Sequence, residues 1–359
     1  MKIKRMEIVK AMKKVCTNNT GSSIIPVYEQ ALLACNKDKL VISKVNNESE
    51  IHVDVAVEDG KDEVMSVDAK VLCGILEKLK SEHVNIEKQD NAVKVFTDKF
   101  NATYESFGRE DFPSPMASES VLATVDVKVK DFLGILKMSS LSCSAENFNI
   151  ALKSILLSIK SDKVLSVGTD GKRMSVSEMA GTFSSERDIV LPNMYATIKS
   201  VFTDEEQILN IKISEKILEM TAGGIRYVVM LVLIAYPNYS KVIPDYQGWN
   251  SLKVKCEELA NAMDIVTVKE TAHKDVLWEI SKDKIEVCKM DTGKKIASYV
   301  LSAEYDGSPV KVSLNSDYAK QLFKSYDKDD VEVKIKDGSS PIVFGYDGFK
   351  HIIMPLKTK

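Results

Sequence analysis

Residues 32 to 43 read LLACNKDKLVIS, and similar stretches recur as LLSIKSDKVLSV at 156 to 167 and as VLWEISKDKIEV at 276 to 287. In each copy an alternating apolar run leads through a polar Asp-Lys turn into a second alternating run, which is typical of a β-hairpin. The aspartates of the three turns are spaced by 124 and 121 residues. A nearly constant spacing of this size predicts three similar domains in series.

Helical patterns of apolar residues lie ahead of and behind each predicted hairpin. The patterns ahead of the hairpins cover 6–16, 129–139 and 256–266, and those behind them cover 68–79, 191–202 and 315–326. Alternating strands follow each second helix. Pro, Gly and polar residues cluster at 112–120 and 242–250, where we expect the domain boundaries. The sequence therefore predicts an α+β chain of three domains, each with two helices packed on antiparallel sheets: 1–120, 121–246 and 247–359.

The composition excludes several classes of protein. A chain of 359 residues exceeds the usual size of one hydrophobic core. Its six cysteines form no C-x-x-C pair and its four histidines no H-x-x-x-H pair, so we expect neither a metal site nor a disulfide framework. The longest apolar run, 227–236, is too short to cross a bilayer, and the first ten residues lack the apolar core of a secretory signal. We therefore expect a cytoplasmic protein without a membrane partner.

Lysines recur on the outward faces of the predicted helices. Helix 6–16 directs Ile8, Met12 and Val15 to one side by their helical spacing. The lysines of this and four further helices fall on exposed faces: Lys10, Lys13, Lys14, Lys78, Lys80, Lys137, Lys199, Lys320 and Lys324. The sixth helix, 256–266, differs because it carries Glu257 and Glu258.

A row of lysines on a helix is ordinarily a solvated face, but recurrence on five of six helices favours a shared purpose. If all six helices faced one axis, they would form a concave basic surface that attracts phosphate without reading sequence. The formal net charge of −3 argues against coating of nucleic acid by bulk attraction, yet it permits such a local surface. Three domains would make half a ring, and a two-fold dimer would complete it.

The segment VGTDGKRM, 167–174, could suggest a phosphate loop, a catalytic carboxylate or a turn. Its glycines are three apart and arginine follows the lysine, whereas a P-loop requires G-x-x-x-x-G-K-[ST]. A second motif, MDTGKK at 290–295, contains the Asp-Thr-Gly of aspartic proteases, but Asp291 lies among lysines rather than in a dry site shared by two aspartates. Both segments therefore favour β-turns, and no catalytic residue is predicted.

Together with the threefold repeat, three segments resemble the signatures of the bacterial DNA polymerase III beta subunit, the sliding clamp. They are VGTDGKRM, YPNYSKVIP at 236–244 and HIIMPL at 351–356. Each is short, but their order and spacing agree with the family over the whole chain. The resemblance implies the DNA-clamp fold in a ring-shaped, head-to-tail homodimer, with helices lining the hole and sheets outside.

The resemblance also implies the function. Such a ring encircles double-stranded DNA independently of sequence and confers processivity by tethering the DNA polymerase III catalytic subunit. Its further partners are the clamp loader and other proteins that carry clamp-binding motifs, and it has neither enzymatic activity nor a cofactor. The alternative from the repeat pattern alone is a scaffold that binds proteins and no DNA.

The family has a peptide-docking pocket between its second and third domains. By position, the pocket of this chain would consist of Leu152, Thr169, Gly171, Lys172, Arg173, Met174, Pro237, Lys241, Val242, Ile352, Met354 and Leu356. Aliphatic and sulfur side chains would bury an apolar peptide, with Arg173 and Lys241 at the rim. The chain departs from the family at Lys172, where histidine is common, and at Leu233 and Ile234, where relatives carry an acidic residue and glycine.

Overall fold

The computed structural model of the chain describes residues 1–18, 25–117, 120–181, 183, 186–268, 274–326, 328–346 and 348–357. Residues 118 and 119 of the expected boundary segment 112–120 lie outside the described residues. The chain forms two compact units. Unit 1 comprises Met1–Leu133 and Met194–Leu231, and unit 2 comprises Gly134–Asn193 and Val232–Lys359. The middle third of the chain is thus divided between the two units.

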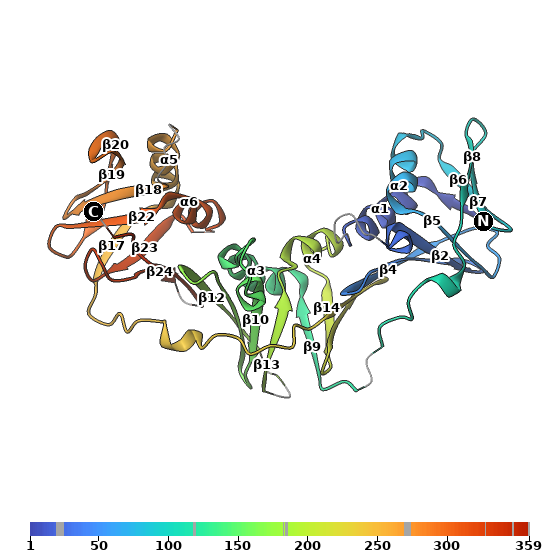
Figure 1. Cartoon of the computed structure of the whole chain (residues 1–359), viewed down its shortest axis with the longest axis horizontal. Coiled ribbons are helices and arrows are strands. Elements are labelled where there is room, and N and C mark those ends of the chain that lie inside the picture. Colours follow the sequence, from blue (N-terminus) through green and yellow to red (C-terminus); the bar gives the residue numbers. More distant parts are fainter. Residues whose placement is uncertain are drawn as a thin grey trace. The chain divides into compact units, whose positions relative to one another are not determined.

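All six predicted helices are present (Figure 1). Their bounds are α1 (Arg5–Cys16), α2 (Ala69–Lys78), α3 (Val129–Ser142), α4 (Tyr195–Val201), α5 (Cys256–Val266) and α6 (Ser316–Ser325). Helix α1 buries Ile8, Met12 and Val15, as its periodicity predicts. The fourth helix is shorter than predicted because the residues up to Pro192 continue a strand. Within the described residues, no helix has both the length and the apolar character that a membrane span requires.

Unit 1 contains two antiparallel sheets. The first pairs its strands in the order β1 (Lys2–Lys4), β6 (His83–Gln89), β7 (Ala92–Phe96) and β8 (Asn101–Glu105). The second has eight strands in the order β5 (Glu63–Asp68), β2 (Gln30–Asn36), β3 (Lys39–Val45), β4 (Ser49–Ala56), β16 (Ile225–Met230), β15 (Ile217–Ala222), β14 (Ile208–Ile213) and β9 (Ala123–Lys128). Helix α1 packs on β3 and β4 and contacts both α2 and α4.

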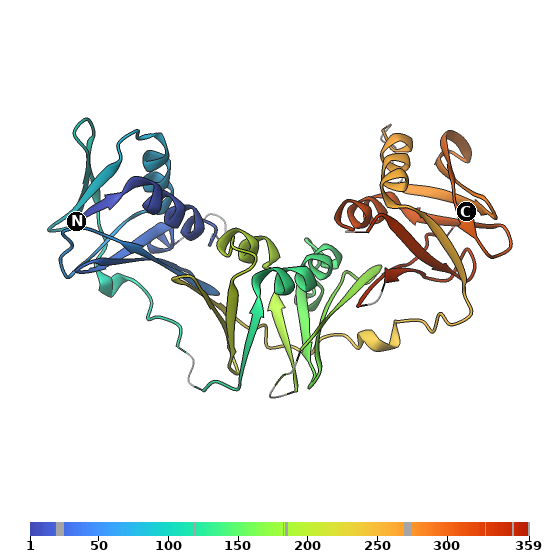
Figure 2. The same ribbon diagram turned by 180° about the vertical axis from the view of Figure 1, so that it is seen from behind.

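Unit 2 also contains two antiparallel sheets. The larger runs β13 (Arg187–Pro192), β10 (Ser154–Ile159), β11 (Lys163–Thr169), β12 (Arg173–Ala180), β25 (Phe349–Ile353), β24 (Ile342–Tyr346), β23 (Asp330–Ile335), β17 (Asn250–Lys255) and β21 (Glu304–Tyr305). The smaller runs β20 (Lys294–Ser302), β19 (Lys284–Asp291), β18 (Asp275–Ser281) and β22 (Val310–Asn315). Helices α5 and α6 contact each other, and their pairing can be followed in Figure 2. The three predicted hairpins are confirmed as β2–β3, β10–β11 and β18–β19.

The order of elements reveals a repeat finer than the threefold one. A module of one strand, one helix and three strands recurs six times: β1 to β4, β5 to β8, β9 to β12, β13 to β16, β17 to β20 and β22 to β25. Consecutive modules exchange their first strands, since β1 pairs with β6 of the second module and β5 pairs with β2 of the first. The same exchange joins β9 to β14 and β13 to β10, and then β17 to β23 and β22 to β18. The six modules are therefore joined as three consecutive pairs.

Two further strand pairings join modules from different thirds of the chain. Strand β4 pairs with β16 in unit 1, and β12 pairs with β25 in unit 2, in both cases antiparallel. Each pairing joins the last strands of two modules, and we call such a pairing a seam. One seam joins two groups of four strands into the eight-stranded sheet, and the other joins a group of four and a group of five into the nine-stranded sheet.

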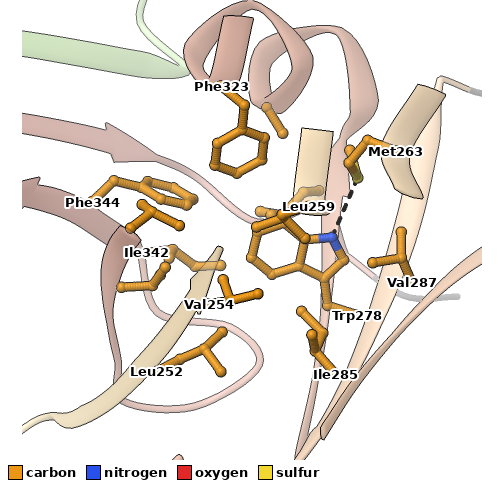
Figure 3. Packing of buried hydrophobic residues seen from close by; sticks show 14 of the residues in the cluster. Leu252, Val254, Leu259, Met263, Trp278, Ile285, Val287, Phe323, Ile342 and Phe344 are labelled. Carbon is orange, nitrogen blue, oxygen red and sulfur yellow. Dashed lines mark hydrogen bonds between the residues drawn. The ribbon is translucent and has the colours of Figure 1, made fainter. Parts of the chain in front are cut away.

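The core of unit 2 is centred on Trp278 of β18, which is fully buried. Figure 3 shows its indole ring between α5, α6 and the strands of both sheets. The ring stacks on Phe323 with centroids 6.2 Å apart and meets Phe344 edge-on at 6.2 Å. Its Nε1 donates to the Met263 sulfur at 3.5 Å, so the only polar atom of the side chain has a partner.

The seam of unit 2 contains a buried polar chain. Ser175 Oγ lies 2.6 Å from His351 Nδ1 and 2.7 Å from Ser142 Oγ. Both His351 and the two serines are almost completely buried. Burial is the main cause that lowers the pKa of His351 to about 3, and the nearby charge of Arg173 acts in the same direction. The imidazole therefore stays neutral in the folded chain.

Replacement of Trp278 by alanine should lower the free energy of unfolding of unit 2 by about 3–5 kcal/mol, because it leaves a cavity in a closely packed aromatic core. Urea denaturation followed by the fluorescence of Trp249, which lies in unit 2, measures the loss. The exposed Ile208→Ala serves as the control. A Trp278→Ala variant as stable as the control would contradict the assignment of this residue to the core.

The buried His351 predicts a pH dependence of stability. Its folded pKa lies below the ordinary value of about 6.5, so below that pH the unfolded chain binds a proton that the folded chain does not. Stability contributed by the neutral imidazole is present above pH 6.5 and falls by about 1.4 kcal/mol per pH unit as the pH drops toward 3. The difference in unfolding free energy between the native chain and His351→Gln, measured from pH 7.5 to 5.5, should decrease accordingly. A pH-independent difference would refute a neutral buried His351.

Candidate nucleic-acid interface and peptide-docking site

The segment 169–173 forms a compact turn between β11 and β12. Asp170 Oδ1 accepts from the backbone N–H groups of Lys172 at 2.9 Å and Arg173 at 3.0 Å. Thr169 Oγ1 donates to the Arg173 carbonyl at 2.7 Å and accepts from the Gly171 N–H at 3.1 Å. Gly171 has φ +87°, a conformation that favours glycine. The predicted turn is confirmed. Its aspartate stabilises the turn by accepting hydrogen bonds from the backbone.

Arg173 lies elsewhere than at the expected rim of the pocket. Its side chain is only 8% exposed, with Nε 3.2 Å from Asp170 Oδ2 and Nη1 donating to Gln321 Oε1 at 2.7 Å. The guanidinium also covers the ring of Tyr318 at 4.2 Å. Its charge and donors are thus used within unit 2, to join the turn to α6. The sequence gives no sign of this, because Tyr318 and Gln321 are far away along the chain.

Met174 and Ile352 face each other across the seam of β12 and β25. Both are buried in an apolar cluster rather than presented at the surface. The cluster also receives Tyr236, Tyr239 and Ile243, from the segment that precedes β17. The Tyr236 hydroxyl donates to the Val167 carbonyl at 3.2 Å, and this anchors the segment. These covering residues were not predicted as part of the site, although their aromatic-apolar spacing was visible in YPNYSKVIP.

The remaining predicted pocket residues are exposed or half-buried. Val242, Met354 and Leu356 are exposed by 54%, 43% and 38%, which is high for large apolar side chains. Gly171, Lys172, Pro237 and Lys241 are also exposed, and Leu152 and Thr169 are half-buried. The Met354 N–H donates to the Lys172 carbonyl at 2.9 Å, so the seam itself brings the segments 167–174 and 351–356 together.

The apolar residues that replace a polar turn of the family are exposed. Leu233 is 68% and Ile234 39% exposed, next to Val232, whose N–H donates to the Val190 carbonyl at 2.8 Å. Nothing in the structure explains the large side chains at 233 and 234.

The predicted lysines differ in their surroundings. Five of them are exposed on or directly after their helices: Lys10, Lys13, Lys78, Lys80 and Lys199. Lys13 forms an ion pair with Glu77 of α2 at 2.8 Å, and the hydrogen bond to Glu77 raises the pKa of Lys13. On α6, exposed Lys324 forms an ion pair with Asp264 of α5 at 3.1 Å. Lys13 and Lys324 therefore lie at the surface, and each joins its helix to a neighbouring helix.

Three predicted lysines are only half-exposed. Lys14 donates to the Val201 carbonyl at the end of α4 and to Thr203 Oγ1 at 3.2 Å, and burial lowers its pKa. Lys320 donates to Thr267 Oγ1 at 3.1 Å, and Lys137 of α3 is half-buried. Lys14 and Lys320 are partly held by these bonds and are less free than their helical positions predict.

The described residues contain one group of side chains with the composition of a metal site, formed by Glu279, Glu286 and Cys288. The ammonium of Lys295 lies between its carboxylates, 3.1 Å from Glu279 and 2.9 Å from Glu286. The ammonium group of Lys295 thus occupies the position between the two carboxylates where a metal ion would bind. All six cysteines are free thiols.

The Asp-Thr-Gly motif forms the two-residue turn between β19 and β20. Asp291 pairs with Lys294, and both Thr292 and Gly293 have positive φ, at +47° and +80°. This geometry is typical of a tight hairpin turn, as predicted.

Comparisons with known proteins agree with this architecture. Residues 1–116 match the family model for the N-terminal domain of the DNA polymerase III beta subunit, and residues 126–238 match that for its central domain. The chain is 20% identical to the beta sliding clamp of Vibrio cholerae, over 99% of both chains, and 22% identical to that of Rickettsia felis, over 94% and 93%.

Solved sliding clamps have the same fold. The DnaN clamp of Pseudomonas aeruginosa bound to griselimycin superposes with a TM-score of 0.93 at 17% identity, covering 100% of this chain and 99% of that one. The beta subunit of Thermotoga maritima gives a TM-score of 0.91 at 15% identity, with coverage of 100% and 99%. From its matched domains, its full-length relatives and its modules, the chain belongs to the DNA polymerase III beta subunit family, the beta sliding clamps.

Proposed function

We propose that two copies of the chain close into a head-to-tail ring around double-stranded DNA and hold the replicative polymerase on it. In this proposal the chain has three domains of two modules each, 1–120, 121–246 and 247–359. The chain catalyses no reaction and needs no cofactor, because a closed ring holds the polymerase on DNA simply by encircling the duplex. We place this function in the cytoplasm.

The pattern of seams carries this proposal. Each seam joins the last strands of two modules, and four of the six last strands are used in this way within the chain. Among the described residues, β8 pairs only with β7, and β20 pairs only with β19. A second copy offers β20 to β8 and β8 to β20, which gives two equivalent seams and closes the assembly.

The free edge of β20 has the character of an interface. Ile296 and Val300 are exposed by 40% and 54% on a strand that lacks a second neighbour in the described chain. A long edge strand with exposed apolar residues pairs readily with another chain. Strand β8 is short and alternates half-buried with exposed residues, as suits an edge that receives a partner.

The lysines of the helices supply the attraction for DNA. Phosphate contacts by lysine ammonium groups position a duplex without reading its sequence, and they weaken with salt. We assign this role to Lys10, Lys13, Lys14, Lys78, Lys80, Lys137, Lys199, Lys320 and Lys324.

The exposed apolar groups around the seam of β12 and β25 supply the docking site. We assign to it the polymerase catalytic subunit, the clamp loader and other proteins with clamp-binding motifs. Val242, Met354 and Leu356 offer apolar surface, and Lys172 and Lys241 offer exposed charge beside it. Docking of a peptide that reaches Met174 and Ile352 requires the covering segment 236–243 to move.

A scaffold that binds proteins without DNA was the alternative from the sequence. The relatives do not favour it, since those that match over the full chain are beta sliding clamps. Topology distinguishes the two functions, because only a ring stays on a closed circle and leaves a linear end.

The clamp should remain on nicked circular DNA after loading and dissociate when the circle is linearised. The substitutions Lys13→Glu and Lys324→Glu should weaken this association and lower the slope of log K against log salt by about 0.9 for each lost phosphate contact. Retention on circles, measured by gel filtration over a salt series, checks the effect. Lys284→Glu, at the exposed start of β19, is the control, and equal retention of all variants would exclude α1 and α6 from the DNA surface.

The double substitution Val242→Asp and Met354→Asp should weaken binding of the docking peptide of the polymerase catalytic subunit about tenfold or more. The reason is that a carboxylate would have to be desolvated on the apolar surface that the peptide covers. Isothermal titration calorimetry measures the affinity. The control is Ile208→Asp, an equally exposed apolar residue on β14. Unchanged affinity of the double variant would refute the docking site.

A further inference from the structure

The two seams within the chain follow one register, which can be read from their ends. In the seam of β4 and β16, the Asp54 N–H donates to the Gly224 carbonyl at 2.9 Å, and Glu50 lies opposite Val228. Gly224 has φ +75° and ends the two-residue turn that precedes β16.

The seam of β12 and β25 repeats this arrangement. The Glu178 N–H donates to the Gly348 carbonyl at 2.7 Å, and Met174 lies opposite Ile352. Gly348 has φ +81° and immediately precedes β25. In both seams an acidic residue therefore faces a glycine of positive φ in the turn of the joined hairpin.

The hairpins of the seams are of two kinds. In one kind four residues separate the last paired residues, as between Val45 and Glu50 in β3–β4 and between Thr169 and Met174 in β11–β12. In the other kind two residues do so, as between Ala222 and Ile225 in β15–β16. Each seam joins one hairpin of each kind. The acidic residue lies on the hairpin with the four-residue turn, four positions after the first paired residue of its strand: Asp54 after Glu50, and Glu178 after Met174.

The two unpaired last strands complete the series. Hairpin β7–β8 has a four-residue turn between Phe96 and Asn101, and hairpin β19–β20 has a two-residue turn that ends in Gly293, with φ +80°. Four positions after Asn101 is Glu105, which is again acidic. The open edges thus carry both partners of the contact that closes each internal seam.

We propose that β20 of a second copy continues the sheet of β8 in this register, with Gly293 opposite Glu105 and Lys294 opposite Tyr104. This inference rests on the proposed ring and adds which residues meet in it. It is limited to the turn end of β20, because a bulge between Lys295 and Ala297 shifts the later residues by one position.

Charge at the two open edges is complementary. In the closed seams the acidic residue forms an ion pair with a lysine of its own sheet, Asp54 with Lys39 at 2.7 Å and Glu178 with Lys163 at 3.1 Å. On the neighbouring strand, Val41 faces Asp54 and Leu165 faces Glu178, and each lysine lies two positions before that facing residue. Ala92 faces Glu105, so the equivalent position there is Asp90. At the open edge an acid therefore replaces the lysine.

The acidic end of β8 also borders a cavity that can receive the partner. A cavity of about 610 Å³ is lined there by four acidic residues and two basic ones: Asp90, Glu105, Glu110, Asp111, Lys88 and Arg109. The turn of β19–β20 carries exposed Lys294 next to Lys295. In the proposed register, Lys294 of a second copy therefore lies beside Glu105, at an edge where Asp90 stands in place of the lysine of the internal seams.

Engineered cysteines test the register. Tyr104 and Lys294 would form a pair without mutual backbone hydrogen bonds, in which Cα atoms are about 4.5 Å apart, within the range of a disulfide. The variant with Tyr104→Cys and Lys294→Cys should form a covalent dimer under mild oxidation, seen on a non-reducing gel and reversed by reductant. The control with Tyr104→Cys and Lys295→Cys, shifted by one residue, should remain monomeric on the gel, as should the native chain with its six cysteines.

The outcomes separate this register from the ring itself. Light scattering of the native chain first reports its mass, and a monomer at working concentration would refute the proposed ring. A dimer that is cross-linked only by the shifted pair, or by neither pair, would overturn the register. Independently, Glu105→Lys should weaken dimerisation about tenfold and addition of Lys294→Glu should restore it. Absence of this rescue would refute the charge contact.

Discussion

The structure depends on one constraint, that a β-strand at the edge of a sheet has unpaired backbone groups which another strand must satisfy. Each module ends in such a strand. In unit 1 the edge of β4 is satisfied by β16, and in unit 2 that of β12 by β25. The same constraint explains why the middle third of the chain is shared between two compact units, since one seam joins its strand β16 to the first third and the other joins its strand β12 to the last third.

The proposed docking site depends on a seam as much as on its side chains. Lys172 and Met174 come from one module, Ile352 and Met354 from another, and only the pairing of β12 with β25 places them in one surface. Below them, the neutral His351 and its serines fill the seam with hydrogen-bonded groups that need no charge.

The sequence predicted the local structure well, because the periodicities of α1 and of the three hairpins are strong and are repeated. It revealed a threefold repeat but not the sixfold one, since first strands such as the three-residue β1 are too short to show a period and pair with another module. It placed the turn at 169–173 correctly, yet not Arg173, whose partners Tyr318 and Gln321 are brought near only by folding. The exposed edges of β8 and β20 were also beyond prediction, because an edge is defined by which strands are absent beside it.

The ion pairs between neighbouring helices have a consequence for movement along DNA. Lys13 and Lys324 already hold carboxylates of Glu77 and Asp264. In the proposed ring, a phosphate that approaches such a lysine would replace one anionic partner with another, so the net gain in free energy would be small and nearly the same at every position of the duplex. A surface of exchangeable pairs attracts the duplex and yet gives no position along it a deep energy minimum. Easy sliding of the ring along the duplex would then depend on the acidic partners Glu77 and Asp264 rather than on the lysines themselves.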